Sequence, residues 1–146
     1  MGSQIIGILI GGFIPAILFG ASGFLNKVSI EKGISPSIYL ICVGLSTIVT
    51  GGLFCSFESI SKATRSAYLT AVGSGLCWSI AAISVSIALQ NYRVPISKLV
   101  PLYNMNTLVA VLLGLCFYAE WKDANVSQLI IGSLLIVGGG VLVAKA

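Results

Sequence analysis

Polar and aromatic side chains recur at helical spacing inside three long apolar stretches of this 146-residue chain. They form three stripes: Phe19, Ser22, Gly23 and Asn26; Ser74, Trp78, Ala81 and Ala82; and Tyr103, Asn106, Thr107, Ala110 and Gly114. Aromatic rings combined with amides and hydroxyls can hold a small molecule by stacking and hydrogen bonding. The predicted substrate-binding residues are therefore Phe19, Ser22, Asn26, Trp78, Tyr103, Asn106 and Thr107. The alternative is that these groups bond one another between packed helices.

Other site chemistry is not expected from this sequence. It contains no His, and its apolar stretches carry no carboxylate, no nucleophile paired with a base and no phosphate-binding glycine loop. We therefore expect no enzymatic activity, no catalytic residue, no cofactor and no metal site. The cysteines show no close pairing and are expected to be free, buried thiols. The net charge of +4 gives no argument for nucleic-acid binding.

The elements that must position the stripes are five apolar runs, each about 20 residues long and free of charged side chains, which is the length a helix needs to cross a bilayer. They predict helices over about residues 5–25, 38–57, 67–89, 95–119 and 126–144. Hydrophobic residues make up 57% of the chain and charged residues 8%, which leaves too little polar surface for a water-soluble domain. The runs are continuous rather than alternating, which excludes a transmembrane β-barrel. We predict an all-α integral membrane protein, a single domain made of a bundle of five transmembrane helices.

Prolines and glycines suggest how these helices are shaped. Pro15 and Pro101 lie inside spans and lack an N–H, so both helices should kink, either to improve packing or to open a cavity. Glycines in the last span, including Gly132 and the triplet 138–140, give that helix a smooth face. We expect this face to pack against a partner subunit.

The fourth and fifth spans carry a family resemblance. Pro101-Leu102, Leu112-Leu113-Gly114, Ala119-Glu120 and the series Gly132, Leu135-Ile136 and Gly138-Gly139 are similar to the closing signature of the EamA-like branch of the drug/metabolite transporter superfamily, and Gly20, Phe24 and Lys27 resemble its opening. The usual member has ten spans in two five-span halves of inverted topology, with a cavity formed by the first, third and fourth helices of each half. This chain resembles one half.

The resemblance implies an assembly, because one half cannot enclose a site at the bilayer midplane. Two copies would form a homodimer, antiparallel as inverted repeats are. Basic residues number three on one side of the membrane and five on the other, a small bias that permits both orientations in one membrane. The chain also resembles the four-span small multidrug resistance proteins, but Phe19 stands where they carry a proton-coupling glutamate.

The sequence thus predicts a secondary transporter or facilitator of a small organic solute, working as a dimer with a cavity between the copies. Its expected location is the lipid of a bacterial inner (plasma) membrane, as a multi-pass protein. Two alternatives stay open. One is a non-transporting membrane assembly subunit, in which the polar stripes only join helices, and the other is a half-transporter that needs a separately encoded inverted partner.

Overall fold

The computed structural model describes residues 6–59, 62–118, 121 and 125–145, and all of their regular structure is helical. The elements are η1 (Leu9–Phe13), α2 (Ile14–Glu31), α3 (Pro36–Cys55), α4 (Arg65–Asn91), α5 (Ile96–Tyr103), α6 (Asn106–Tyr118) and α7 (Val126–Lys145). They make five helices that are long and apolar enough to cross a membrane: Ile6–Glu31, Pro36–Cys55, Arg65–Asn91, Ile96–Tyr118 and Val126–Lys145. The predicted all-α fold with five candidate spans is confirmed, as expected of a multi-pass membrane protein.

Aromatic side chains at the helix ends fit this assignment. Tyr68 lies in the first turn of α4 and Tyr92 caps its last turn, and both are exposed. Tyr118 ends α6 and Trp121 follows shortly after, again exposed. Tyr and Trp favour the boundary between hydrocarbon and water because one end of each ring is apolar and the other polar. Their positions mark the expected membrane surfaces.

The first span is longer than the apolar run that predicted it. Its helix continues through Asn26 to Glu31, and Lys27 forms an (i, i+4) ion pair with Glu31 at 3.6 Å on this last turn. The helix ends where Gly33 takes a left-handed conformation with φ of 92°, and the N–H of Ile34 returns to the carbonyl of Ser29. This is the glycine-capped ending that favours a sharp stop. Asn26 is therefore a helical residue and not part of a connection.

The second span begins as the sequence indicates. Ser35 is the N-cap of α3, its hydroxyl accepts a hydrogen bond from the N–H of Ile38 at 3.4 Å, and Pro36 occupies the first turn. A proline is well tolerated there because its missing N–H would have no partner within the helix. The remaining boundaries lie within about two residues of the predicted ones, the usual uncertainty of helix ends, and residue 119 lies outside the described residues.

Both internal prolines lie beside an irregularity. Before Pro15 the chain forms the π-helical turn η1, in which the N–H of Ile14 reaches back to the carbonyl of Leu9. After Pro101 the fourth span divides into α5 and α6, and the N–H of Met105 bonds the carbonyl of Leu102, three residues back, instead of four. Each irregularity changes the local ladder of backbone bonds where a proline cannot donate.

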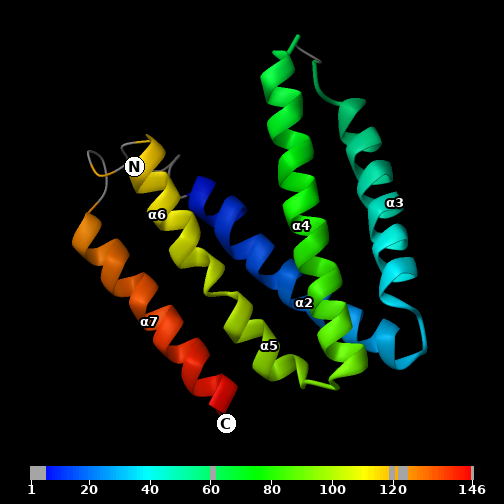
Figure 1. The fold of residues 1–146 in the computed structure, drawn as a ribbon. Coiled ribbons are helices and arrows are strands. Elements are labelled where there is room, and N and C mark those ends of the chain that lie inside the picture. Colours follow the sequence, from blue (N-terminus) through cyan, green and yellow to red (C-terminus); the bar gives the residue numbers. More distant parts are fainter. Residues whose placement is uncertain (1–5, 60–61, 119–120, 122–124, 146) are drawn as a thin grey trace. The chain divides into compact units, whose positions relative to one another are not determined.

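The chain divides into two compact units, Met1–Arg93 and Val94–Ala146. In the first unit α3 and α4 lie side by side, and α2 contacts both (Figure 1). In the second unit α7 runs back alongside α5 and α6. Each unit positions its own set of polar residues.

Candidate functional site

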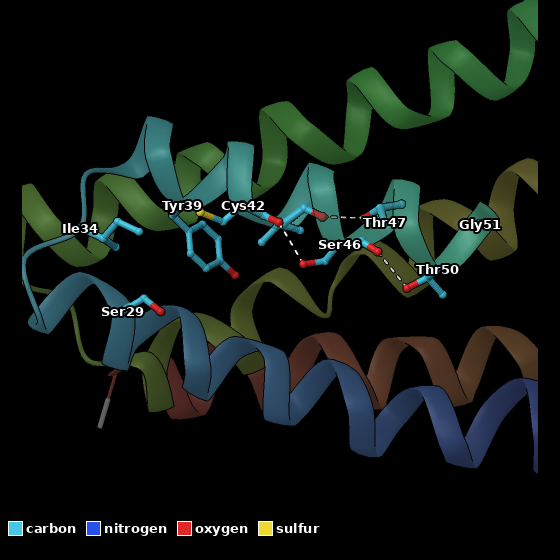
Figure 2. Close-up of a pocket in the computed structure, with 9 residues that line it drawn as sticks. Ser29, Ile34, Tyr39, Cys42, Ser46, Thr47, Thr50 and Gly51 are labelled. Carbon is cyan, nitrogen blue, oxygen red and sulfur yellow. Dashed lines mark hydrogen bonds between the residues drawn. The ribbon is translucent and has the colours of Figure 1, made fainter. Parts of the chain in front are cut away.

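A groove with a volume of about 540 Å³ lies between α2 and α3 in the first unit. Its lining residues are Ser29, Ile34, Tyr39, Cys42, Val43, Ser46, Thr47, Thr50 and Gly51. In Figure 2 these side chains come mostly from α3, with Ser29 contributed by the last turns of α2. The volume falls within the range of about 300–1,000 Å³ that is usual for small-molecule sites. The groove is therefore large enough to hold an organic solute.

Three hydroxyls of α3 follow one another along the groove, and we refer to Ser46, Thr47 and Thr50 as the hydroxyl ladder. Each donates its hydrogen to the carbonyl four residues earlier on the same helix: Ser46 Oγ to Cys42 at 3.0 Å, Thr47 Oγ1 to Val43 at 2.9 Å and Thr50 Oγ1 to Ser46 at 2.8 Å. Such bonds let hydroxyls exist in an apolar medium without a partner on another helix. The ladder therefore needs no neighbouring protein to satisfy it.

Asn26, a predicted binding residue, lies in the interface between α2 and α4. Its side chain is buried, and its Oδ1 accepts a hydrogen bond from Ser86 Oγ at 3.2 Å. Ser86 is fully buried and is also 3.0 Å from the carbonyl oxygen of Ala82 on its own helix. The pair joins two helices distant in sequence. This geometry is what a structural interhelical contact requires, and it leaves open whether Asn26 also meets a solute.

The other predicted residues of the first unit are exposed. Ser22 is a hydrogen-bond partner of the Tyr39 phenol, which brings it to the edge of the groove. Phe19 is 67% exposed and Trp78 is 47% exposed, and neither lines the groove. Only Ser22 of the predicted residues thus touches the groove lining, through Tyr39.

The remaining predicted residues, Tyr103, Asn106 and Thr107, lie in the second unit at the junction of α5 and α6. Thr107 Oγ1 donates to the carbonyl of Asn104 at 2.9 Å, at the position where α5 ends. Asn106 is the first residue of α6 and is exposed. The three residues therefore gather at a break in a membrane-length helix, where the regular backbone ladder is interrupted.

The glycine face of α7 is only partly open. A Cβ added at Gly140 would lie 2.6 Å from the carbonyl oxygen of Pro101, so α5 and α7 meet here backbone to backbone. Gly132, Gly138 and Gly139 have open space where a Cβ would stand. One glycine of the predicted partner face is thus used inside the chain, and the expected subunit contact stays a prediction for the other three.

All four cysteines are free, as predicted. The prediction that they are buried is wrong, because Cys42, Cys55, Cys77 and Cys116 are all exposed on the chain. Membrane helices present apolar and thiol side chains outward, where a soluble protein would cover them. Cys42 is the cysteine that lines the groove.

The residues of α3 that line the groove are not among the predicted site residues. Their spacing carries a signal, since Cys42, Ser46 and Thr50 repeat every four residues, and Tyr39, Val43, Thr47 and Gly51 repeat in the same way beside them. Positions four apart share one face of a helix. Hydroxyls in membrane helices so often bond their own backbone that this spacing alone does not distinguish a site from a helix surface.

Comparisons of the chain with models of protein families, with curated proteins and with solved structures give no match. The resemblance to the EamA-like branch therefore stays a prediction.

Proposed function

We propose that this chain is a secondary transporter or facilitator of a small organic solute. The observation that carries the proposal is the groove of about 540 Å³ between α2 and α3, which is lined by hydroxyls within a unit of membrane-length helices. A solute-sized hollow whose lining is mostly apolar, with a few hydroxyls along one wall, has the composition usual for small-molecule sites.

The proposed working form is a homodimer, antiparallel in the membrane, in which each copy is one half of an EamA-like transporter. The exposed predicted residues support this assembly, since Phe19, Trp78 and Asn106 present aromatic and amide groups away from the chain itself. A second copy would cover such groups and complete a cavity. The one carboxylate of the described spans, Glu31, lies at the end of the first span and none lies in the middle of a span, so the proposed activity is uniport or solute exchange.

Flux through the purified protein tests the activity directly. We would reconstitute the chain in vesicles and follow entry of glycerol, nicotinamide, tetramethylammonium and benzoate. The proposal predicts saturable flux of at least one of these probes above that of protein-free vesicles. No flux of any of the four would contradict it.

A paired substitution tests the residues predicted from sequence. Replacing Trp78 and Asn106 together by Ala should lower the flux strongly if both face the solute. Unchanged flux in this variant would remove them from the site while leaving transport intact. Ser84→Ala is a matched control, because its hydroxyl bonds the carbonyl of Ile80 at 2.7 Å on its own helix and does not line the α2/α3 groove.

Single cysteines at Ser37 and Glu58, introduced into a cysteine-free chain, test the antiparallel dimer. Ser37 lies in the first turn of α3, Glu58 lies just beyond the other end of this helix, and both residues are exposed. A membrane-impermeant thiol reagent should label both of them in intact cells if the chain inserts in two orientations. Labelling of one position alone would favour a single orientation and with it a separately encoded inverted partner.

A second candidate is a membrane assembly subunit that does not transport. The open positions around Gly132, Gly138 and Gly139 favour it, because small residues let another helix approach closely. Copurification of a stoichiometric unrelated membrane protein, together with absence of flux from the isolated chain, would support this function over transport.

A further inference from the structure

The groove between α2 and α3 extends along most of one span. Its α3 lining runs from Tyr39 to Gly51, about 18 Å along a helix axis, and α3 itself covers 20 residues, or about 30 Å. The hydrocarbon core of a bilayer is also about 30 Å thick. The groove therefore reaches through more than half of the apolar layer that a solute must cross.

The hydroxyl ladder supplies three of the hydroxyl groups that line this groove, beside those of Ser29 and Tyr39. Ser46, Thr47 and Thr50 each give their one hydrogen to a backbone carbonyl, at 2.8–3.0 Å. A hydroxyl has one donor and two acceptor lone pairs, so each oxygen keeps acceptor capacity when its hydrogen is committed. The groove thus offers acceptors along α3, and a solute that uses them must donate hydrogen bonds.

The lack of charged side chains in the groove lining limits the class of solute further. No lining residue is acidic or basic. A cation or an anion that leaves water for such a groove loses its hydration and finds no opposite charge, which is expensive in a membrane. An uncharged solute with hydroxyl or amide N–H groups loses less, because the ladder oxygens replace part of its water shell.

Other occupants fit these acceptors poorly. A lipid acyl chain has no hydrogen-bond donor. A span of a second copy has its backbone N–H groups engaged within its own helix and consists mainly of apolar side chains. Either occupant would cover the ladder without using it.

We propose that the α2/α3 groove binds an uncharged organic solute that donates hydrogen bonds through hydroxyl or amide groups to Ser46, Thr47 and Thr50. The inference rests on the proposed transport function and names the class of its solute. Val43 and Ile34 supply the apolar part of the contact, and the Tyr39 ring provides a face for stacking.

Cys42 provides a reporter inside the groove. A chain with Cys42 as its single cysteine, the other three being Ala, would be reconstituted in vesicles and alkylated with N-ethylmaleimide. We expect glycerol or nicotinamide to slow alkylation of Cys42, with little effect from tetramethylammonium or benzoate. A chain with Cys77 alone is the control, since Cys77 lies on α4 and does not line the groove. Equal protection by charged and neutral probes, or protection by none, would overturn the proposal.

The ladder is tested by removing two of its oxygens. Thr47→Val with Thr50→Val keeps the branched shape of both side chains and removes two acceptors, so protection by the neutral probe should weaken about tenfold in concentration. Thr70→Val is the matched control, because Thr70 Oγ1 makes the same bond to the carbonyl of Ser66, at 3.1 Å, outside the groove. Unchanged protection in the double variant would overturn the role of the ladder.

The two proposals fail in different ways. Flux of glycerol or nicotinamide without protection of Cys42 would leave transport standing and remove the groove from it. Protection of Cys42 without flux of any probe would keep the binding site and remove transport. Formation of a disulfide between Cys42 residues of two copies would show that a second chain fills the groove, which contradicts solute binding there.

Discussion

Helices meet by different chemistry in the two units. Between α2 and α4 a buried side-chain hydrogen bond joins Asn26 to Ser86 at 3.2 Å. Between α5 and α7 the contact is steric, because Gly140 lets the helix backbone approach the carbonyl of Pro101 so closely that a Cβ would stand 2.6 Å from it. The contact between α2 and α4 depends on a hydrogen bond between two side chains, and the contact between α5 and α7 depends on the absence of a side chain at Gly140.

The comparison shows which polar residues are free to act. Asn26 and Ser86 are buried, and the hydrogen bond from Ser86 Oγ to Asn26 Oδ1 is used to join two helices of the fold. The hydroxyl ladder of α3 is satisfied by its own backbone and remains exposed. In a membrane protein, therefore, polarity within a span is weak evidence for a site until the partner of each group is known.

We expect the largest loss of stability when a side chain is added at Gly140, where α7 meets the backbone of α5. Gly140→Val should destabilise the chain by about 2–3 kcal/mol, because the added methyl groups force α7 away from Pro101. Unfolding by titration with sodium dodecyl sulfate, followed by circular dichroism, would measure the loss. Gly139→Val is the control, since its Cβ meets open space and the change in helix propensity is the same. Equal effects of the two substitutions would show that the close contact is not what holds α7.

Removing the Ser86 hydroxyl, which donates the hydrogen bond between α4 and α2, should cause the next largest loss of stability. Ser86→Ala leaves Asn26 Oδ1 buried without its partner on α4, which should cost about 1–2 kcal/mol. Ser84→Ala removes a hydroxyl that bonds its own helix on an exposed position and should change stability by less than about 0.5 kcal/mol. The same unfolding titration compares the two variants. A similar loss from both would show that the bond between the helices adds nothing beyond local hydroxyl bonding.

The turn at Gly33 that joins α2 to α3 should be less sensitive to substitution. Gly33 has a φ of 92°, which L-residues rarely adopt, and nothing crowds its Cβ position. Gly33→Ala should therefore cost about 1 kcal/mol through backbone strain alone. Gly20→Ala is the control, because Gly20 also lies in open space but in a regular helix of the same unit. A Gly33→Ala variant as stable as Gly20→Ala would indicate that the turn can relax without strain.

The fold was predictable because bilayer thickness limits the possible answers. Runs of about 20 apolar residues must be helical when no water is present to bond the backbone. The structure departs from prediction at the end of the first span, where the polar turn that contains Lys27 and Glu31 stays helical. The fourth span is interrupted between α5 and α6, close to Pro101, where the sequence predicts a kink. Hydropathy alone gives neither outcome.

The site was less predictable, because spacing identifies a face but not what the face meets. The stripe that contains Asn26 combines a buried structural contact with Phe19, which is 67% exposed. The groove lies instead along α3, whose hydroxyls belong to none of the three predicted stripes. The position of the groove between α2 and α3 depends on the turn at Gly33 and on the packing of both helices against α4. No periodicity in the sequence encodes that turn or that packing.

The smallest expected loss of stability comes from replacing Asn26, which accepts the hydrogen bond between α2 and α4. Asn26→Val replaces the amide by an apolar side chain of similar size, and it leaves Ser86 Oγ bonded to the carbonyl of Ala82 at 3.0 Å. No buried group loses its last partner, so the cost should be about 0.5 kcal/mol, below that of Ser86→Ala. The double variant, Asn26→Val with Ser86→Ala, should be no less stable than Ser86→Ala alone, because it no longer contains the Asn26 amide that loses its partner in the single variant. The coupling free energy between the two sites should be about 1 kcal/mol. A cost for Asn26→Val greater than that for Ser86→Ala would reverse the assignment and make Asn26, through contacts other than Ser86, the residue on which α2 depends.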